Sequence, residues 1–315
     1  MKSTASAPAK VILFGEHFVV YGIKAILCSI EKRVFVTSVK TDKPIIFVKS
    51  NLGEISVPVS KSITEIKSPF VPFIYIAKKM IDLFKHPGGI DITVESEIPS
   101  GVGLGSSSAC CVAAAGSISG LFTKYSKDEI LNLAIEAEKT IFKDTSGADC
   151  TVCTYGGIIE YDKKSGFKKI NTKLDLSLII ANTKIPHSTK HIVRKVKEFK
   201  DKNEKQFSEL CQNELNLIER VKLALSSSDI KSIGQAMIQN QKFLEQIGVS
   251  NDKLNELLGD ANHTSFGSKI TGAGGGGCII ALVDETNSKN TLKNLQSKNH
   301  ECFPAQMDSK GLDTF

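Results

Sequence analysis

The chain has 315 residues, of which 41% are hydrophobic and 23% charged, and its net charge at pH 7 is +6. This composition is typical of a globular protein with one large or two ordinary domains, and we expect two lobes. The mild positive charge suits anionic small molecules, but it lacks the dense basic clusters of nucleic-acid binders. No apolar run approaches the roughly 20 residues that span a bilayer. We therefore expect a cytoplasmic protein without nucleic-acid or membrane partners.

The first 50 residues are rich in apolar and β-branched side chains, which predict β-strands. The apolar runs lie at 11–14, 33–37 and 45–48. Lys10 precedes the first run, and the polar turn Gly15-Glu16-His17 follows it. Taken alone, these residues indicate no more than a surface charge and a hairpin.

A Gly- and Ser-rich loop at residues 99–109 connects a strand-like run at 89–98 to a helix-like run at 110–115. Glycines let backbone N–H groups converge on phosphate oxygens, and the N-terminus of the following helix adds partial positive charge. The spacing fits neither the Walker A motif nor the dinucleotide-binding motif. We interpret the segment as a phosphate-binding loop, with a plain surface loop as the alternative.

Two helices are predicted in the first half of the chain. Apolar residues recur at helical spacing over 72–85, and a capping box formed by Ser126 and Glu129 opens a helix that runs to about residue 142. Glu138 falls on the apolar face of this second helix, so it is predicted to point inward. A buried carboxylate is costly unless it is paired or binds a metal, and both readings stay open.

Asp149 follows the short segment Thr145-Ser146-Gly147-Ala148, which predicts a tight turn, and we expect a strand after it. This position suits a fixed carboxylate at the mouth of a site. An ordinary turn aspartate is the alternative.

The eight cysteines predict reduced thiols in a reducing compartment. Those within apolar or small-residue runs, and therefore expected to be buried, are Cys28, Cys110, Cys111 and Cys278. Cys150 and Cys153 have the spacing of a redox pair or of half a zinc site. No second pair at ligand spacing occurs in the sequence, so we favour core packing for them.

The second half of the chain begins with a predicted hairpin around residues 158–166 and a strand at 176–181. Residues 188–258 are almost wholly helical in pattern, and the last two strands are expected at 268–271 and 278–283. Four consecutive glycines lie between those two strands. Because apolar runs flank them, we expect a close approach to a ligand or to other backbone rather than a bare linker.

Three segments together resemble the three ordered motifs of the GHMP kinase superfamily: residues 8–21, 99–109 and 269–278. Within that superfamily, three further segments resemble the mevalonate kinases, in a short form like the archaeal ones: residues 15–22, 182–189 and 244–250. The resemblance implies an α+β fold of two lobes. These are an N-terminal, ATP-binding lobe like ribosomal protein S5 domain 2 at 1–175 and a ferredoxin-like lobe at 176–315, with the site between them.

The resemblance also implies roles for individual residues. It makes Lys10 and Asp149 catalytic, and it makes Ser107 and Glu138 ligands of Mg²⁺. The implied ATP-phosphate loop consists of Gly101, Gly103, Leu104, Gly105, Ser106, Ser107 and Ser108. The implied substrate-binding residues are Glu16, His17, Thr183, Gly272 and Ala273.

The activity implied is ATP-dependent phosphorylation of (R)-mevalonate at its 5-hydroxyl, in isoprenoid biosynthesis. Two departures from the usual pattern are Ala9 before the lysine and Phe142-Lys143 where many members have His-Gly. Three alternatives stay open: a sister GHMP kinase with another acceptor, a non-catalytic ligand sensor, and a redox protein using Cys150 and Cys153. The oligomeric state, including a homodimer, is left open too.

Overall fold

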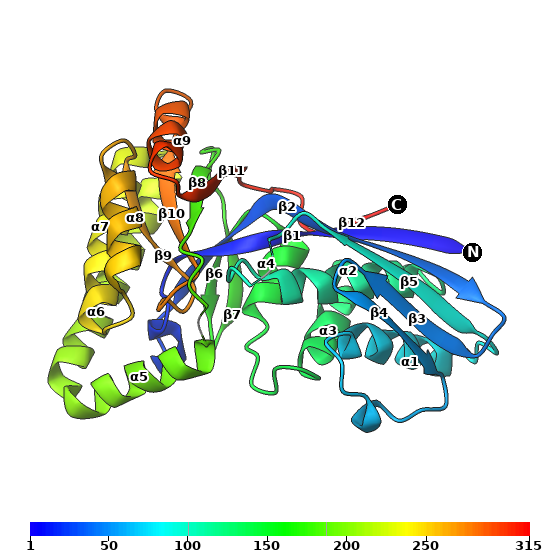
Figure 1. The fold of residues 1–315 in the computed structure, drawn as a ribbon. Helices are drawn as coiled ribbons and strands as arrows, with labels where there is room; N and C mark the ends of the chain where they lie inside the picture. Colours follow the sequence, from blue (N-terminus) through cyan, green and yellow to red (C-terminus); the bar gives the residue numbers. More distant parts are fainter. Residues whose placement is uncertain (100, 187) are drawn as a thin grey trace.

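Two β-sheets, each covered by helices, divide the molecule into two lobes (Figure 1). The computed structural model describes residues 1–99, 101–186 and 188–315. Within these residues, the first lobe holds an eight-stranded sheet and the second a four-stranded sheet. The predicted α+β fold of two lobes is therefore confirmed.

The first sheet has the strand order β12-β1-β2-β5-β3-β4, and β6 and β7 extend it from β2. Its strands are β1 (Lys2–Phe14), β2 (Ala25–Thr41), β3 (Ile45–Ser50), β4 (Gly53–Pro58), β5 (Gly89–Ser96), β6 (Ile158–Asp162), β7 (Gly166–Ile170) and β12 (Asp313–Thr314). The helices of this lobe are α1 (Val71–Phe84), α2 (Ser106–Gly120), α3 (Lys127–Glu138) and α4 (Ala148–Tyr155), with short 3-10 turns η1 (Phe18–Tyr21) and η2 (Ile63–Glu65).

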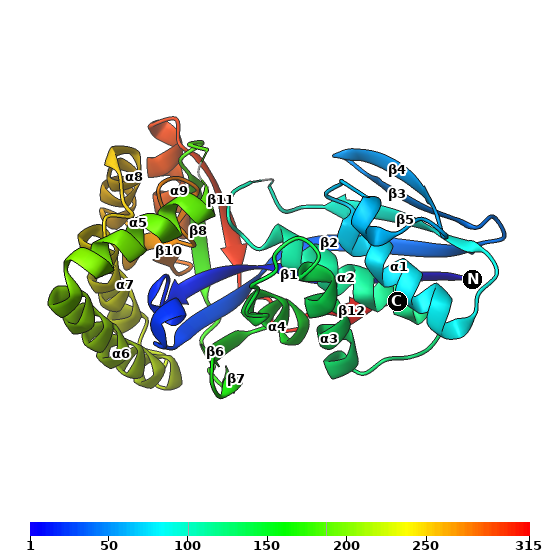
Figure 2. The same ribbon diagram turned by 90° about the horizontal axis from the view of Figure 1, so that it is seen from below.

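Helices α1 to α4 lie together over one face of the first sheet (Figure 2). Helix α2 packs on β1 and β2 at the centre of this layer. Its small residues allow a close approach, since a Cβ added at Gly116 would lie only 3.1 Å from the Cβ of Ala5. The tight packing fixes the N-terminal end of α2, where the glycine-rich loop enters, relative to β1.

The second sheet has the strand order β11-β8-β10-β9. Its strands are β8 (Ser177–Asn182), β9 (Gly267–Thr271), β10 (Cys278–Val283) and β11 (Glu301–Gln306). The helices are α5 (Thr189–Lys202), α6 (Glu204–Ser226), α7 (Ile230–Gln246), α8 (Asp252–Asn262) and α9 (Ser288–Ser297). Helix α7 packs on β9 and α9 on β8 and β11, while α6 packs on α7 (Figure 1).

Many predicted elements are confirmed within a few residues. Helix α1 matches the predicted 72–85, and Ser126 and Glu129 form the predicted capping box of α3, although α3 ends at Glu138 rather than near residue 142. Glu138 is 3% exposed, so its inward direction is confirmed. Four elements of the structure have no counterpart among the predicted ones: β4, α9, β11 and β12. No helix in the described ranges is long and apolar enough to cross a membrane.

The strand expected after Asp149 is wrong, because these residues form helix α4. Gly147 precedes the helix with a left-handed φ of 77°. The hydroxyls of Thr151 and Thr154 donate to carbonyls four residues earlier, at 2.8 Å each. Threonine and valine favour strands on their own. Packing of α4 against α2, α3 and β1 overrides that preference.

The two lobes meet at the end of β1. The backbone N–H of Ile12 donates to Thr271 Oγ1 of β9 at 2.9 Å, and that of Gly15 donates to Glu214 Oε1 of α6 at 2.8 Å. Through these hydrogen bonds the first motif, residues 8–21, contacts the second lobe.

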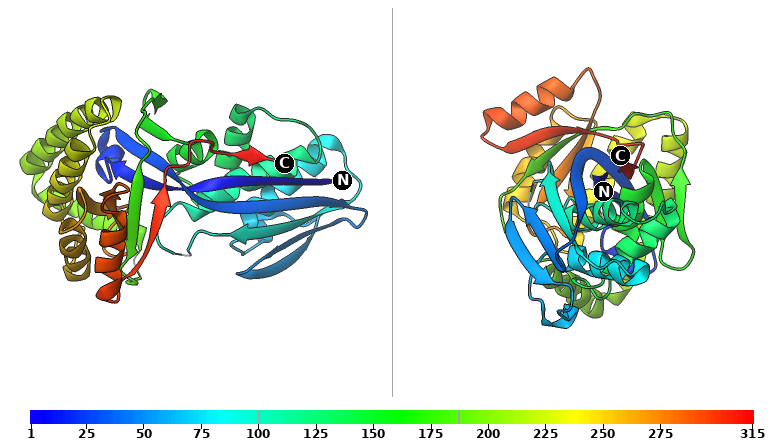
Figure 3. Two further views of the ribbon diagram at one scale, coloured as in Figure 1. Left: turned by 90° about the horizontal axis from the view of Figure 1, so that it is seen from above. Right: turned by 90° about the vertical axis from the view of Figure 1, so that its right-hand side faces the viewer.

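The last residues leave the second lobe and return to the first sheet. Arg33 of β2 forms an ion pair with Asp308, and Thr314 of β12 lies opposite Ala5 of β1. Both termini therefore lie near each other in the first lobe (Figure 3). The chain passes from β7 of the first sheet to β8 of the second between Ile170 and Ser177, and its last strand, β12, returns to the first sheet.

Candidate active site

A lysine and an aspartate from separate motifs meet where β1 approaches α4. Lys10 lies in β1 and Asp149 in the first turn of α4, and Lys10 Nζ is 2.9 Å from Asp149 Oδ2. The Lys10 side chain is 5% exposed and that of Asp149 36%. The first turn of a helix favours an acidic residue because of the helix dipole. The pair thus combines a buried cation with a carboxylate that a substrate can reach.

The glycine-rich loop lies directly against Lys10. The backbone N–H of Lys10 donates to the carbonyl of Leu104 at 2.9 Å. Gly105 caps the N-terminus of α2 with a left-handed φ of 73°. The three serines that follow form the first turn of α2, and Ser106 and Ser107 are half-buried. Loop, helix N-terminus and ion pair therefore form one continuous site.

Replacing Gly105 tests how closely the loop and Lys10 fit. A Cβ there would lie 2.7 Å from Lys10 Cγ, and the left-handed φ adds backbone strain. We expect Gly105→Ala to lower kcat/KM roughly 10- to 100-fold by displacing Lys10, as steady-state kinetics would measure. Gly166→Ala is the matched control, because Gly166 also has a left-handed φ, 81°, and open space around it, but it lies at the start of β7 and outside the proposed site. Equal losses in both variants would contradict this explanation.

The carboxylate of Glu138 is held between two hydroxyls. Ser108 donates to Oε1 and Thr145 to Oε2. Ser107 and Glu138 are the expected ligands of Mg²⁺, and the hydroxyl that contacts Glu138 in the structure belongs to the residue after Ser107. Thr145 is absent from the predicted site. Its only sequence signal is its place in the turn that leads to Asp149. A carboxylate with neighbouring hydroxyls provides the hard oxygen ligands that Mg²⁺ prefers.

The turn after β1 contains a buried ion pair. Glu16 and Lys269 of β9 are in contact, and their side chains are 1% and 0% exposed. Burial raises the pKa of Glu16, and the ammonium of Lys269 opposes this rise. Burial also lowers the pKa of Lys269. Charged groups are buried at low cost only when paired, so this contact fixes the turn against β9.

His17 lies in the same turn and contacts the third motif. Its Nε2 is 2.8 Å from the carbonyl oxygen of Ala273. Burial lowers the pKa of His17, and the nearby Lys269 adds to that effect. The imidazole is therefore held mostly neutral at the junction of the two lobes.

The third motif lies between the glycine-rich loop and the end of β8. A Cβ at Gly272 would lie 3.8 Å from the carbonyl oxygen of Gly103. At the other end of the motif, the carbonyl of Gly277 accepts from both the N–H and the hydroxyl of Thr183, at 2.9 Å each. The structure thus places the third motif beside the first two.

Two residues of the predicted motifs, Ser100 and His187, lie outside the described residues.

The chain is similar to known proteins over most of its length. The sequence matches the family descriptions "GHMP kinases N terminal domain" over residues 73–157 and "GHMP kinases C terminal" over 221–302. It is 34% identical to the mevalonate kinase of Thermococcus onnurineus, covering 92% of this chain and 91% of that protein. It is 32% identical to the mevalonate kinase of Methanocaldococcus jannaschii, covering 95% and 98%. This chain is a member of the mevalonate kinase family.

Solved mevalonate kinases share the fold of this kinase over nearly its whole length. The Methanococcus jannaschii enzyme superposes with a TM-score of 0.86 at 29% identity, covering 96% of this chain and 98% of that one. The L. major mevalonate kinase, solved in complex with R-mevalonate, superposes with a TM-score of 0.82 at 25% identity, covering 96% and 95%. A galactokinase from Lactococcus lactis, at 18% identity, shares the fold alone.

The cysteines of this kinase are mostly core residues. Cys150 and Cys153 lie in α4 with 0% exposure each, and burial raises both pKa values well above the usual range. Such thiols are poor nucleophiles and poor metal ligands. This supports core packing over a redox or zinc site. Burial of Cys28, Cys111 and Cys278 is confirmed, but Cys110 is only half-buried.

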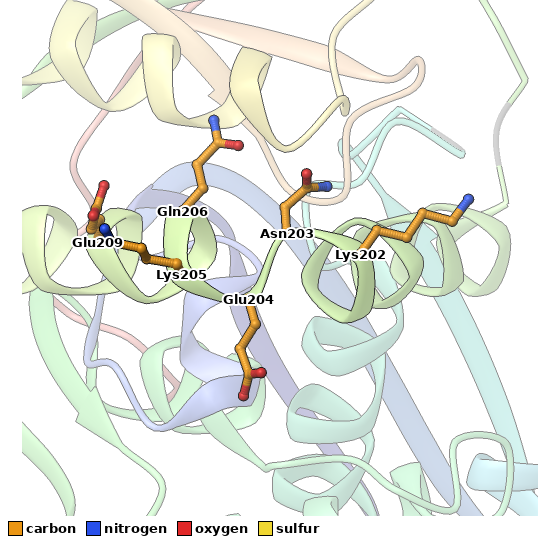
Figure 4. Close-up of a pocket in the computed structure, with 6 residues that line it drawn as sticks. All are labelled: Lys202, Asn203, Glu204, Lys205, Gln206 and Glu209. Carbon is orange, nitrogen blue, oxygen red and sulfur yellow. The ribbon is translucent and has the colours of Figure 1, made fainter.

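A surface hollow of about 480 Å³ lies away from these residues, where α5 meets α6. Its lining residues are Lys202, Asn203, Glu204, Lys205, Gln206 and Glu209. In Figure 4 the side chains of Lys202, Glu204 and Gln206 point in different directions, and all six residues are exposed. Without convergent groups, this hollow offers no alternative active site.

Proposed function

We propose that this kinase transfers the γ-phosphoryl group of ATP to the 5-hydroxyl of (R)-mevalonate. Family membership supports the reaction class, and the mevalonate complex of the L. major relative supports the acceptor. The observation that carries the proposal is the ion pair of Lys10 and Asp149 at 2.9 Å, directly beside the glycine-rich loop. Lys10 of this pair lies against the loop proposed to bind phosphate, and the carboxylate of Asp149 is accessible to an acceptor.

In this proposal the donor side of the site is the loop at 101–108. Its backbone N–H groups and the N-terminus of α2 bind the triphosphate, because converging amides and the helix dipole favour anions. Lys10 stabilises negative charge on the transferring group. Phosphoryl transfer needs positioning and charge neutralisation more than covalent help from the protein.

Glu138 and Ser107 are the proposed holders of Mg²⁺. The donor set near Glu138 fits this ion, because one carboxylate and adjacent hydroxyls leave the remaining ligand positions to phosphate and water oxygens. Bound Mg²⁺ would neutralise charge on the phosphate oxygens. The hydroxyls of Ser108 and Thr145 hold the Glu138 carboxylate in place.

On the acceptor side, Asp149 orients the 5-hydroxyl and accepts its proton as the new O–P bond forms and the bond from Pγ to the leaving oxygen of ADP breaks. Glu16, His17 and Thr183 are proposed to line the acceptor pocket, with Gly272 and Ala273 closing it. Support for this comes from the junction at which His17 meets Ala273.

The test is a coupled ADP-release assay with ATP and Mg²⁺ and four separate acceptors: (R)-mevalonate, phosphomevalonate, galactose and homoserine. We expect turnover with mevalonate alone, and NMR of the product should place the phosphate on the 5-oxygen. Turnover of another acceptor in place of mevalonate would reassign the pocket to a sister kinase. Failure with all four acceptors would favour a ligand sensor.

A further inference from the structure

A third buried charge lies behind the turn that carries Glu16 and His17. Glu214 of α6 is 0% exposed, and it lies close enough to the ion pair of Glu16 and Lys269 for both charges to act on its pKa. We call these two carboxylates and one ammonium the buried cluster. The three side chains come from α6, the turn after β1, and β9. The cluster therefore joins both lobes directly behind the acceptor side of the site.

Both carboxylate oxygens of Glu214 are occupied. Oε1 accepts from the backbone N–H of Gly15 at 2.8 Å, and Oε2 accepts from Nδ2 of Asn240 in α7 at 2.6 Å. Two helices of the second lobe thus hold a backbone group of the first motif.

The turn that Glu214 contacts has an unfavourable backbone conformation. Gly15 has a φ of 93° and His17 a φ of 61°, and both values lie in the left-handed region. A non-glycine residue adopts this region at a cost, so the surroundings must hold it there. Glu214 supplies part of that support at the first residue of the turn.

The turn sets the direction of the two side chains beyond it. Glu16 contacts Lys269, and His17 contacts Ala273 at 2.8 Å. Oε2 of Glu16 is buried and has no hydrogen-bond partner among the residues that the structure describes. A rotation of the Gly15 peptide would move both side chains together.

We propose that Glu214 is a positioning residue for the acceptor half of the site, holding Glu16 and His17 through the Gly15 N–H. This inference rests on the proposed function, since it assigns the turn to mevalonate binding. Glu214 does not touch the donor side, so its loss should affect mevalonate and spare ATP.

The chemistry of the cluster supports a positioning role for an acceptor rather than a packing role. A second carboxylate beside Glu16 is a costly way to fill space. Burial and the charge of Glu16 raise the pKa of Glu214 to about 7, against the lowering effects of Asn240, Lys269 and the Gly15 N–H. In this position Glu214 gives α6 a hydrogen-bond acceptor of fixed geometry for the Gly15 N–H.

The test compares two substitutions of Glu214 by steady-state kinetics. Glu214→Leu removes the acceptor, and we expect KM for mevalonate to rise roughly 10- to 100-fold with KM for ATP changed less than about threefold. Glu214→Gln keeps an acceptor for the Gly15 N–H and should stay within about threefold of wild type for both. Val221→Ala is the matched control, since it removes buried volume two turns further along α6.

Several outcomes would overturn the inference. It fails if Glu214→Leu raises both KM values alike, or only lowers the melting temperature as Val221→Ala does. If Glu214→Leu does not fold, Asn240→Ala is used in its place. We expect Asn240→Ala to raise KM for mevalonate by a smaller factor and to leave KM for ATP unchanged. An unchanged KM for mevalonate would refute the role of the cluster. The wild-type assay separates the two proposals: if another acceptor is turned over, the same comparison is made with that acceptor.

Discussion

Asp149→Asn should lower kcat for mevalonate phosphorylation by roughly 100- to 10,000-fold. The amide keeps the size of the side chain but cannot accept the hydroxyl proton, and it loses the charge that pairs with Lys10 at 2.9 Å. Because Asp149 is proposed to act on the acceptor, ATP binding should change less than about threefold. Steady-state kinetics and nucleotide titration by calorimetry measure the two effects separately.

The control for this variant is Asp91→Asn, which makes the same chemical change on the exposed side of β5. It should leave both kcat and ATP affinity at wild-type values. A kcat near wild type for Asp149→Asn would remove this residue from the mechanism. A large loss of ATP affinity would instead place Asp149 on the donor side.

Lys269→Met should destabilise the protein by about 3–5 kcal/mol at pH 8, as urea unfolding would measure. The substitution leaves the carboxylate of Glu16 buried, without the ammonium that now contacts it. Burial already raises the pKa of Glu16 in the native protein, and removing Lys269 removes the largest opposing effect. The folded state then binds a proton that the unfolded state releases, so stability must fall as pH rises through this range.

The deficit of Lys269→Met should consequently shrink as pH falls from 8 to 5.5, since protonation neutralises Glu16. The double variant Glu16→Gln/Lys269→Met should regain part of the lost stability, because the Glu16 carboxylate is also removed and Glu214 keeps its hydrogen bonds to the Gly15 N–H and Asn240. A deficit below about 1 kcal/mol at both pH values would show that Glu16 finds another partner or solvent. A double variant less stable than Lys269→Met would argue against the charge explanation.

The sequence predicted local structure well where a short pattern of residues occurs in few structural contexts. The capping box of Ser126 and Glu129 predicted the start of α3, because both side chains satisfy N–H groups that the helix leaves free. The apolar spacing of this helix also predicted that Glu138 points inward, as its 3% exposure confirms. Neither inference needs a partner from elsewhere in the chain.

The helical spacing of α6 holds a further signal in the sequence. Leu210, Leu217, Ile218 and Val221 are buried along one face of this helix. Glu214 falls on the same face, four residues after the first and three before the second. A carboxylate in an apolar row predicts a buried partner, but its spacing does not say which one.

The secondary-structure prediction failed where the intrinsic preference of the residues competes with tertiary packing. Threonine and valine around Cys150 favour a strand, yet contacts with three neighbouring elements make α4 a helix. That difference changes the site, since Asp149 now lies in the first turn of a helix beside Lys10. The contacts of the Ser108 and Thr145 hydroxyls with Glu138 were not predicted either, because they depend on how α2, α3 and the turn before α4 pack together.

The sequence by itself determined the three motifs and many of the helices and strands, because glycines, caps and apolar periodicity act over short distances along the chain. The resemblance of those motifs to the GHMP kinases implied the two lobes and the family. Only the tertiary structure decided the pairings: Lys10 with Asp149, Glu16 with Lys269, and Glu214 with the Gly15 N–H. Each joins residues more than 100 positions apart. Such contacts depend on how whole elements pack, and burial in that packing sets the cost of each charge.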